Sequence, residues 1–397
     1  MRRGLAVVAS TSFTVALVAC ASLSGLSGNA DAGSRDAPAT DARATDARHA
    51  DARPAMDGSR ADARAPHDSG SDAAHDAGAD AALHDAAAAV PASCKTLGAG
   101  RSDCGPDAGE SCCTTGEVVG GTYYRTYTNT GGSVLDESAP ATVDSFLLDK
   151  YLVTVGRFRE FVAAVRVGYA PTPGSGIHGY LNGGLGLVNG EGDGGAYETG
   201  WEAVFSGNVA LTGDGPLQSC GSSTWTAAVS SQEKLPINCV NWFEAYAFCI
   251  WDGGFLASEA ELVLAAAGGA QQREYPWGST TPTLAYSINS CGYPDSSVDC
   301  TDGGVGNIAP VGSAGLGAGL WGQLDLVGDV ATWGADWFWN SYPMPCTNCA
   351  ALGQSPQGER VVRGGTYAGG TPTQISRPQD EPLNRSNFWG VRCARSP

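Results

Sequence analysis

The stretch 241–269, NWFEAYAFCIWDGGFLASEAELVLAAAGG, decides the fold because it contains two complete helix signals in succession. Asn241 is followed three residues later by Glu244, and Ser258 is followed in the same way by Glu261. Such a pair is a capping box, in which each side chain binds the backbone N–H of the other residue. Each helix then reaches a Gly-Gly pair, which suits a left-handed helix end. The sequence therefore predicts two short helices that start at Asn241 and Ser258.

Outside this stretch the chain alternates between short periodic segments and long Gly-rich loops. A third helix is expected from about Thr154, because apolar residues recur there at helical spacing. The segment 168–239 has no sustained period and is too long for a plain connection, so it is expected to be a structured insertion held by Cys220, with Cys239 as a second candidate. The predicted class is α+β, with little regular structure and a dependence on disulfides. Strands are expected at 120–127, 145–154, 359–367 and 388–395.

The first twenty residues have the pattern of a bacterial lipoprotein signal peptide (1–20). Arg2 and Arg3 precede an apolar run that is too short to span a membrane and ends in LVAC at Cys20. This ending resembles a lipobox, in which the cysteine is lipidated and becomes the mature N-terminus. Ordinary cleavage with an incidental Cys20 is the alternative. The expectation is a secreted protein anchored in the bacterial cell envelope, and Ala21 after the cysteine favours the outer membrane.

Residues 21–92 consist almost entirely of Ala, Asp, Arg, Gly, Ser, Pro and His. They hold twelve Asp, six Arg and no aromatic residue, so they offer too little apolar surface to offset the entropy of the chain. Four of the five histidines fall here and could bind metal loosely, but a solvated tether between membrane and domain is the simpler interpretation.

The remaining residues, 93–397, carry 29 acidic and 15 basic residues, a net charge of −14. This balance argues against nucleic acid as a partner, because its recognition needs basic patches.

Twelve cysteines follow the tether, an even number that indicates disulfides in an oxidising compartment. The CTNC motif at 346–349 could be a redox pair, but it lies in a Pro-rich loop, which favours a structural bond. A zinc site lacks a second CxxC or a nearby histidine. The cysteines are at positions 94, 104, 112, 113, 220, 239, 249, 291, 300, 346, 349 and 393.

Several motifs in order resemble the formylglycine-generating enzyme, or sulfatase-modifying factor, superfamily. The resemblance covers most of 116–397, after a Cys-rich lead-in at 93–115, and it implies a compact, irregular fold related to C-type lectins. It also implies a disulfide between Cys249 and Cys393. The motifs are FLLDKYLVTVGRFREFV (146–162), LPINCVNWFEAYAFCIWDGGFLASEAELVLAAAGG (235–269), YPWGS (275–279), LDLVGDVATWGADWF (324–338), VVRGGTY (361–367) and WGVRC (389–393).

The resemblance implies an oxidase that holds copper(I) between two cysteines, the first of which follows the RGG turn by four residues. Here that position is Gly369, and the second falls near Gln374. The chain has no cysteine between Cys349 and Cys393, so copper is not expected. A second branch of the superfamily binds iron through several histidines, and residues 93–397 contain one, His178, so iron is not expected either.

The resemblance also implies a calcium loop, which appears here as DLVGDVAT. Asp325 and the carbonyls of Gly328 and Val330 could still bind the ion, and Thr332 stands where the family has a glutamate. The alternative is a tight turn in which Asp325 caps backbone amides.

Two functions from different classes remain. The first is an anchored binding or structural module for an unknown protein, peptide or glycan, because lectin-like relatives use the same C-terminal region as a ligand face. The second is an oxidase or oxygenase whose site is not recognisable from sequence. If Trp389 packs in the core and the arginines pair with Asp380 and Glu381, the face is structural. The residues of the expected face are Tyr367, Arg377, Arg385, Asn387 and Trp389.

Overall fold

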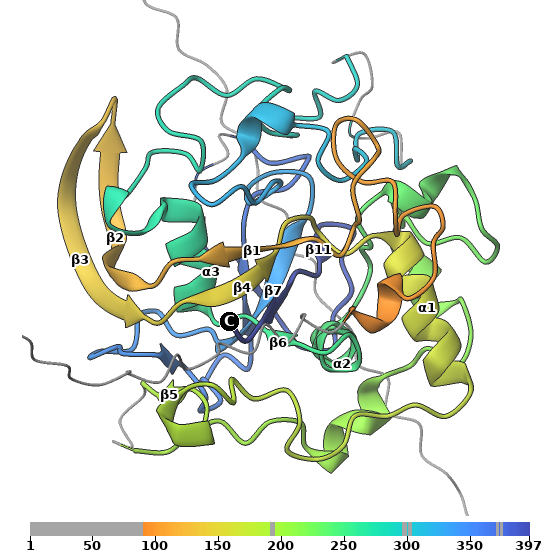
Figure 1. Cartoon of the computed structure of the whole chain (residues 1–397), viewed down its shortest axis with the longest axis horizontal. Coiled ribbons are helices and arrows are strands. Elements are labelled where there is room, and N and C mark those ends of the chain that lie inside the picture. The colour runs from red at the N-terminus through yellow and green to blue at the C-terminus, as the bar shows by residue number, and fades with distance from the viewer. Residues whose placement is uncertain (1–89, 191–194, 296–299, 301–303, 371–372, 374–375) are drawn as a thin grey trace, which may run out of the picture. The chain divides into compact units, whose positions relative to one another are not determined.

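The computed structural model describes residues 90–190, 195–295, 300, 304–370, 373 and 376–397 (Figure 1). The expected signal peptide with Cys20 and nearly all of the expected tether lie outside these residues. No helix among the described residues is long and apolar enough to cross a membrane.

Two four-stranded sheets form the centre of the domain. The first has the order β1-β4-β12-β6 and is antiparallel, and the second has the order β10-β9-β7-β11 with a parallel β7-β11 pair. The β2-β3 hairpin lies at the edge of the view, beside α3 (Figure 1). The strands are β1 Thr115–Val118, β2 Gly121–Thr130, β3 Ser133–Val143, β4 Phe146–Asp149, β5 Val188–Asn189, β6 Phe255–Leu256, β7 Ala331–Trp337, β8 Cys349–Ala350, β9 Arg360–Arg363, β10 Gln379–Asp380, β11 Trp389–Gly390 and β12 Cys393–Arg395.

The three expected helices are confirmed as α1 (Val155–Arg166), α2 (Trp242–Trp251) and α3 (Glu259–Ala267). Both capping boxes form, with the Asn241 and Ser258 side chains each accepting from the glutamate N–H three residues on. Short 3₁₀ helices occupy many of the loops. They are Ala92–Cys94, Asn182–Gly184, Ala203–Asn208, Pro216–Gln218, Ser231–Lys234, Gly269–Gln271 and Gly315–Gly317.

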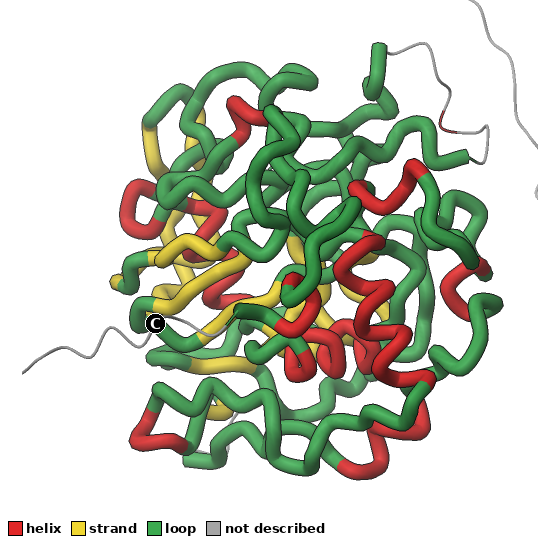
Figure 2. The backbone as a smooth tube through the Cα atoms, turned by 45° about the vertical axis from the view of Figure 1, so that its right-hand side comes forward, coloured by secondary structure: helices red, strands yellow, loops and turns green. Residues whose placement is uncertain are grey.

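Loops still make up most of the described chain, as Figure 2 shows, so the expected mixed class with little regular structure is confirmed. The expected strand lengths are wrong in three places. The segment 359–367 is a strand only at β9, Arg360–Arg363, because the Gly-rich turn follows. The strand expected at 145–154 ends at Asp149, because the chain then turns, and Thr154 forms an isolated bridge with Pro236 and caps α1. The segment 388–395 is split, because β11 pairs with β7 in one sheet and β12 pairs with β4 and β6 in the other.

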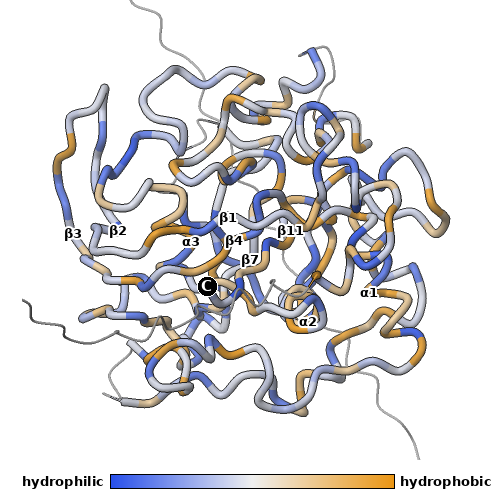
Figure 3. Tube along the Cα trace, in the orientation of Figure 1, coloured by the Kyte–Doolittle hydropathy of each residue, from blue (hydrophilic) through white to orange (hydrophobic). Residues whose placement is uncertain are grey.

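Apolar residues gather at α2 and α3, in the middle of the molecule (Figure 3). One core cluster joins α1 to α2, where the Phe158 and Phe248 rings stack with centroids 5.4 Å apart. A second joins α3 to β4 and the β2-β3 hairpin. Insertion residues such as Trp201 and Leu211 are buried in the first cluster, so the expected insertion is structured.

Six disulfides hold the described chain together. Cys249–Cys393, the pairing that the resemblance implies, joins α2 to β12, and Cys220–Cys239 closes the end of the insertion. The two cysteines of CTNC are buried and bonded to each other. The remaining pairs are Cys94–Cys113, Cys104–Cys112 and Cys291–Cys300.

The lead-in at 93–115 is tied to the core through Arg157 of α1. The Arg157 guanidinium binds Asp149 at 2.9 Å and Asp252 at 2.6 Å, and all three side chains are fully buried. Its Nε also donates to Ser93 Oγ at 3.0 Å, and its Nη1 donates to the Cys112 carbonyl at 3.0 Å. Lead-in atoms therefore satisfy part of a buried cation, which links this segment to the fold of the whole domain.

Candidate functional site

The glycine-rich turn after β9 is built by close backbone approach. Gly364 has φ +92°, a conformation that favours glycine, and a Cβ there would lie 3.0 Å from the Leu326 carbonyl oxygen. The turn therefore packs directly on the loop that follows residue 324.

Tyr367 is the buried residue that holds this turn in place. It is 3% exposed, its N–H donates to the Asp329 carbonyl at 2.6 Å, and its carbonyl accepts from the Cys291 N–H at 2.7 Å. Its hydroxyl accepts from Asn387 Nδ2 at 2.5 Å. Because both its backbone and its hydroxyl are engaged, Tyr367 orders the surface rather than projecting from it.

The two arginines of the expected ligand face are committed to helix carboxylates. Arg377 binds both oxygens of Glu259, at 2.5 and 2.8 Å, and lies over the rings of Phe338 and Tyr342. Arg385 binds Glu244, with a distance of 2.6 Å from Nη1 to Oε2. The alternative that the face is structural expected both arginines to pair with Asp380 and Glu381. Both arginines are paired, but with other carboxylates, so the expected partners are wrong.

Trp389 lies half-buried beside the turn. Its indole N–H donates to Asp380 Oδ2 at 2.7 Å, and its ring meets Trp333 edge to face at 6.5 Å. The structure therefore brings Tyr367 and Asn387 into contact, places Trp389 against Asp380 and Trp333, and holds Arg377 and Arg385 in separate ion pairs.

The cysteine position implied for copper is Gly369, which is partly exposed at the end of the turn. Gln374 lies outside the described residues. The carbonyl of Gly369 accepts from the Ser290 N–H at 2.8 Å, so the neighbouring segment is the loop that carries the Cys291–Cys300 disulfide. The twelve cysteines of the described chain are all paired in disulfides, so none of them is a thiolate in this structure.

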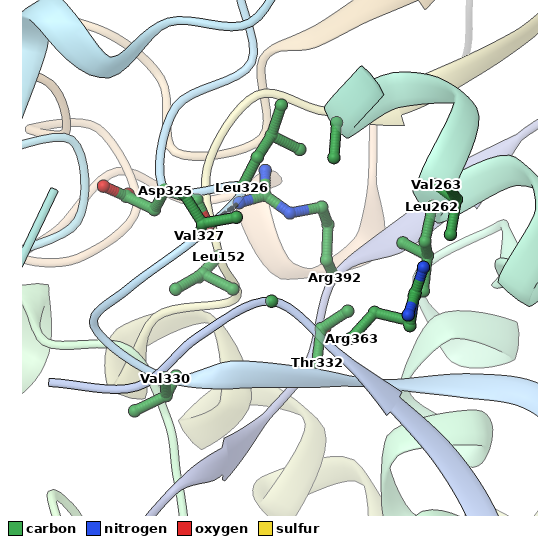
Figure 4. Close-up of a pocket in the computed structure, with 12 residues that line it drawn as sticks. Leu152, Leu262, Val263, Asp325, Leu326, Val327, Val330, Thr332, Arg363 and Arg392 are labelled. Carbon is green, nitrogen blue, oxygen red and sulfur yellow. Dashed lines mark hydrogen bonds between the residues drawn. The ribbon is translucent and has the colours of Figure 1, made fainter. Parts of the chain in front are cut away.

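The loop of the implied calcium site borders a cavity of about 20 Å³ (Figure 4). That volume holds about one water molecule, so the cavity cannot be a substrate site. Arg392, from the segment between β11 and β12, extends toward Leu326 in Figure 4 and donates to the carbonyls of Leu324 and Asp325 at 2.6 and 2.9 Å. These bonds fix the start of the loop.

Two buried carboxylates of this loop form no ion pair with a described residue. Asp325 Oδ2 accepts from the Gly312 N–H at 2.7 Å, and Asp329 Oδ1 accepts from the Ala309 N–H at 3.1 Å. Burial raises the pKa of Asp325 to about 6, against the opposing charge of Arg392. Burial and the neighbouring Asp325 also raise the pKa of Asp329.

The same loop contains oxygen atoms of the kind that bind calcium. Among the described residues, Asp329 Oδ2 and Thr332 Oγ1 are buried and have no hydrogen-bond partner. Calcium would be held by these oxygens, by Asp325 and by the carbonyls of Gly328 and Val330, since it takes six to eight oxygen ligands. No group of three His, Cys, Asp or Glu that suits a metal occurs in the described chain, so backbone oxygens would be needed. Sequence reasoning missed Asp329, although an acidic residue in a loop that is expected to bind calcium was a usable signal.

A larger pocket, of about 460 Å³, lies elsewhere, between the insertion and α2, β7 and β9. Its lining includes Trp242, Trp337 and Arg360, none of which the sequence identified as a site residue. Trp242 lies in the family's helix motif, and only the tertiary fold brings Arg360 to it.

Comparisons with known proteins agree with the motifs. Residues 101–397 match the model of the sulfatase-modifying factor enzyme 1-like domain. A formylglycine-generating enzyme of Thermomonospora curvata is 28% identical over 268 residues, covering 64% of this chain and 82% of that protein. A hercynine oxygenase of Mycolicibacterium thermoresistibile is 32% identical over 176 residues, covering 40% of this chain and 35% of that protein.

The chain is also similar to a relative with an inactive name and to a solved structure. The Mus musculus protein named inactive C-alpha-formylglycine-generating enzyme 2 is 27% identical over 179 residues, covering 43% of this chain and 52% of that protein. Among solved structures, PvdO from Pseudomonas aeruginosa is 18% identical with a TM-score of 0.45, covering 77% of this chain and 99% of that one.

Proposed function

The chain belongs to the sulfatase-modifying factor family, by its match over residues 101–397, and from this premise we propose that it is a binding or structural module that lacks the copper-dependent oxidase chemistry. The observation that carries the proposal is the state of the cysteines. Copper(I) is a soft cation that prefers thiolate ligands. The described cysteines are all in disulfides, and the implied ligand position on the turn is Gly369.

The relatives support both this proposal and its alternative. One family member carries the name inactive formylglycine-generating enzyme, which makes a loss of activity within the family plausible for this chain. Others are named as a formylglycine-generating enzyme and a hercynine oxygenase, and these names favour an oxidase or oxygenase that works through a different set of ligands.

We also propose that the module is presented at the cell envelope. Lipidation of Cys20 would anchor it, and residues 21–92 would hold the folded part away from the membrane. Replacing Cys20 with Ala should then move the protein from the membrane fraction, expected to be the outer membrane, to the soluble fraction. Retention of the C20A variant in the membrane fraction would overturn the anchoring proposal alone.

Metal content and turnover test the central proposal directly. The purified protein is offered copper(I), iron(II) and calcium separately, freed of unbound ions and analysed for each element. A cysteine-containing sulfatase peptide is then tested for aldehyde formation by mass spectrometry. We expect copper and iron to stay well below one ion per chain and no aldehyde to form. Stoichiometric copper or iron together with aldehyde formation would establish the oxidase alternative.

A further inference from the structure

The pocket of about 460 Å³ has the size of a small-molecule site. Trp242 and Tyr246 of α2, Trp337 of β7 and Arg360 of β9 form its inner wall, and Phe205 and Glu202 come from the insertion. Glu202 is exposed, so the pocket opens to solvent on the insertion side. The site lies apart from the glycine-rich turn and from the loop with the two buried carboxylates, since the residues that line it are different.

Arg360 is the unusual member of the inner wall. Its side chain is buried, and its guanidinium lies between two indole rings, 3.8 Å from the Trp242 centroid and 3.6 Å from the Trp337 centroid. Both flat faces of the guanidinium are therefore covered, and hydrogen bonds can form only along its edges.

Only one of those edges has a protein partner among the described residues. Nη1 donates to the Ala335 carbonyl at 2.6 Å, whereas Nε is buried and without a partner, and no acceptor is found for Nη2. No described carboxylate lies within ion-pair distance of Arg360. The buried Arg157 and Arg392, in contrast, bind carboxylates and backbone carbonyls respectively.

A buried cation with no carboxylate in contact is costly, because two indole faces and one carbonyl replace only part of the hydration that burial removes. Burial lowers the pKa of Arg360 to about 9, although Asp336 of β7, Tyr246 of α2 and Glu202 of the insertion favour its charged form. The missing anion is therefore expected from outside the chain. The free edge, Nε with Nη2, is the fork that binds the two oxygens of a carboxylate in parallel.

We propose that this pocket binds a small hydroxy- or amino-substituted carboxylic acid, whose carboxylate pairs with the Nε–Nη2 edge of Arg360. The aromatic side chains of the wall pack against the body of the ligand. Glu202, at the rim, accepts hydrogen bonds from its hydroxyl or ammonium groups. Glu198 is not free for this role, because it binds His178. The inference rests on the proposed binding role and is independent of metal content and of lipidation.

The test uses two acids with matched analogues that lack the carboxylate. D-glucuronate is compared with D-glucose, and L-phenylalanine is compared with L-phenylalaninamide, by calorimetric titration and by the fluorescence of the pocket tryptophans. At least one acid should bind while its analogue does not. Binding of glucuronate identifies a sugar acid as the ligand class, and binding of phenylalanine identifies an amino acid or a peptide C-terminus.

Variants then locate the binding. Arg360→Gln should weaken binding of the acid by at least about tenfold, because a charged hydrogen-bonded pair is lost. Arg360→Lys keeps the positive charge but not the paired N–H donors, so it should also weaken binding of the acid. This second variant keeps the test valid if Arg360→Gln does not fold. Lys95→Gln, which removes a positive charge at an exposed position outside the pocket, is the control and should bind the acid normally.

Two outcomes would overturn the inference. If neither acid binds to the intact protein, Arg360 is not a carboxylate receptor. If an acid binds equally well to the Gln and Lys variants, the carboxylate lies elsewhere. Neither result changes the outcome of the metal analysis, which tests the proposed function. A failure of the carboxylate site and a failure of the proposed function are therefore distinguishable.

Discussion

His178, on the insertion, lies between two carboxylates. Its Nδ1 is 3.0 Å from Glu198 Oε1 and its Nε2 is 3.1 Å from Glu261 Oε2, and all three side chains are buried. Although burial opposes the charge, Glu261 and Glu198 raise the pKa of His178 to about 10. Glu261 also caps α3, so a protonated His178 ties the insertion to that helix.

Replacing His178 with Gln should lower the free energy of unfolding by about 3 kcal/mol near pH 6, because two buried carboxylates lose their cation. The folded pKa is above the unfolded value of about 6.5. The stability that His178 contributes is therefore complete below about pH 6.5 and is lost as the pH rises through about 10. Denaturant unfolding of both proteins at the two ends of this window measures the change.

His84→Gln, in the expected tether, is the control and should unfold like the intact protein. The His178→Gln variant could instead lose the same free energy of unfolding at the acidic and the alkaline end. That result would show that His178 is not charged in the folded state.

Asp329 is the residue through which calcium should be detected. If the ion binds, calcium at about 100 times its dissociation constant should raise the free energy of unfolding by about 2.7 kcal/mol. Asp329→Asn should lose most of this gain, because the amide keeps the shape of the carboxylate but not its charge. Thermal unfolding with calcium and with chelator measures both effects, and Asp107→Asn, at an exposed position, is the control. An equal calcium effect in the Asp329→Asn variant would place the ion elsewhere.

Residue roles could be predicted only where the partner is close in sequence. The sequence argued against iron at His178 but did not indicate its partner Glu261, which is 83 residues away. Arg377 and Arg385 were assigned to a ligand face because their true partners, Glu259 and Glu244, are 118 and 141 residues earlier. Long-range ion pairs of this kind leave no local pattern.

Among the secondary-structure elements, the helices were predictable and the strands were less so. The start of α2 depends on Asn241 and Glu244, which are three residues apart, so the information is local. Strand β4 pairs with β1, 28 to 34 positions earlier, and with β12, 246 or more positions later, where Leu148 faces Ala394 and Leu147 faces Arg395. Strand boundaries are set by those partners and not by propensity.

The Cys249–Cys393 disulfide joins one predictable helix to one unpredictable strand across 144 positions. Replacing both cysteines with Ala should lower the free energy of unfolding by about 5 kcal/mol on the loop-entropy estimate. The Cys291–Cys300 pair spans only 9 positions, so the same change there should remove about 2.5 kcal/mol. Denaturant titrations of the two double variants test the difference. Equal losses would mean that local packing, rather than loop closure, sets the contribution of each bond.

For the whole molecule, the decisive contact is the one between the lead-in and the buried Arg157. The motifs predict a domain at 116–397 after a lead-in at 93–115. The family match covers residues 101–397, and Ser93 of the lead-in contacts Arg157 inside the core. Ser93 N–H also donates to Asp252 Oδ1 at 2.7 Å, so removal of the lead-in leaves a buried carboxylate oxygen as well as the guanidinium short of partners. Motifs cannot reveal this, because the lead-in contributes backbone groups and a serine hydroxyl rather than a recognisable pattern.

A chain that begins at Val90 should therefore unfold in one cooperative transition, and a chain that begins at residue 116 should not. The shorter chain loses the bonds from Ser93 and Cys112 to Arg157 and the two lead-in disulfides, while the buried charges of Asp149 and Asp252 remain. Breaking a buried charge network in this way costs about 3–5 kcal/mol, which is a large part of the stability of a typical domain. Near-ultraviolet circular dichroism during heating compares the two chains. If the shorter chain melts cooperatively at the same temperature, the Arg157 cluster is satisfied without the lead-in, and the domain begins where the motifs begin.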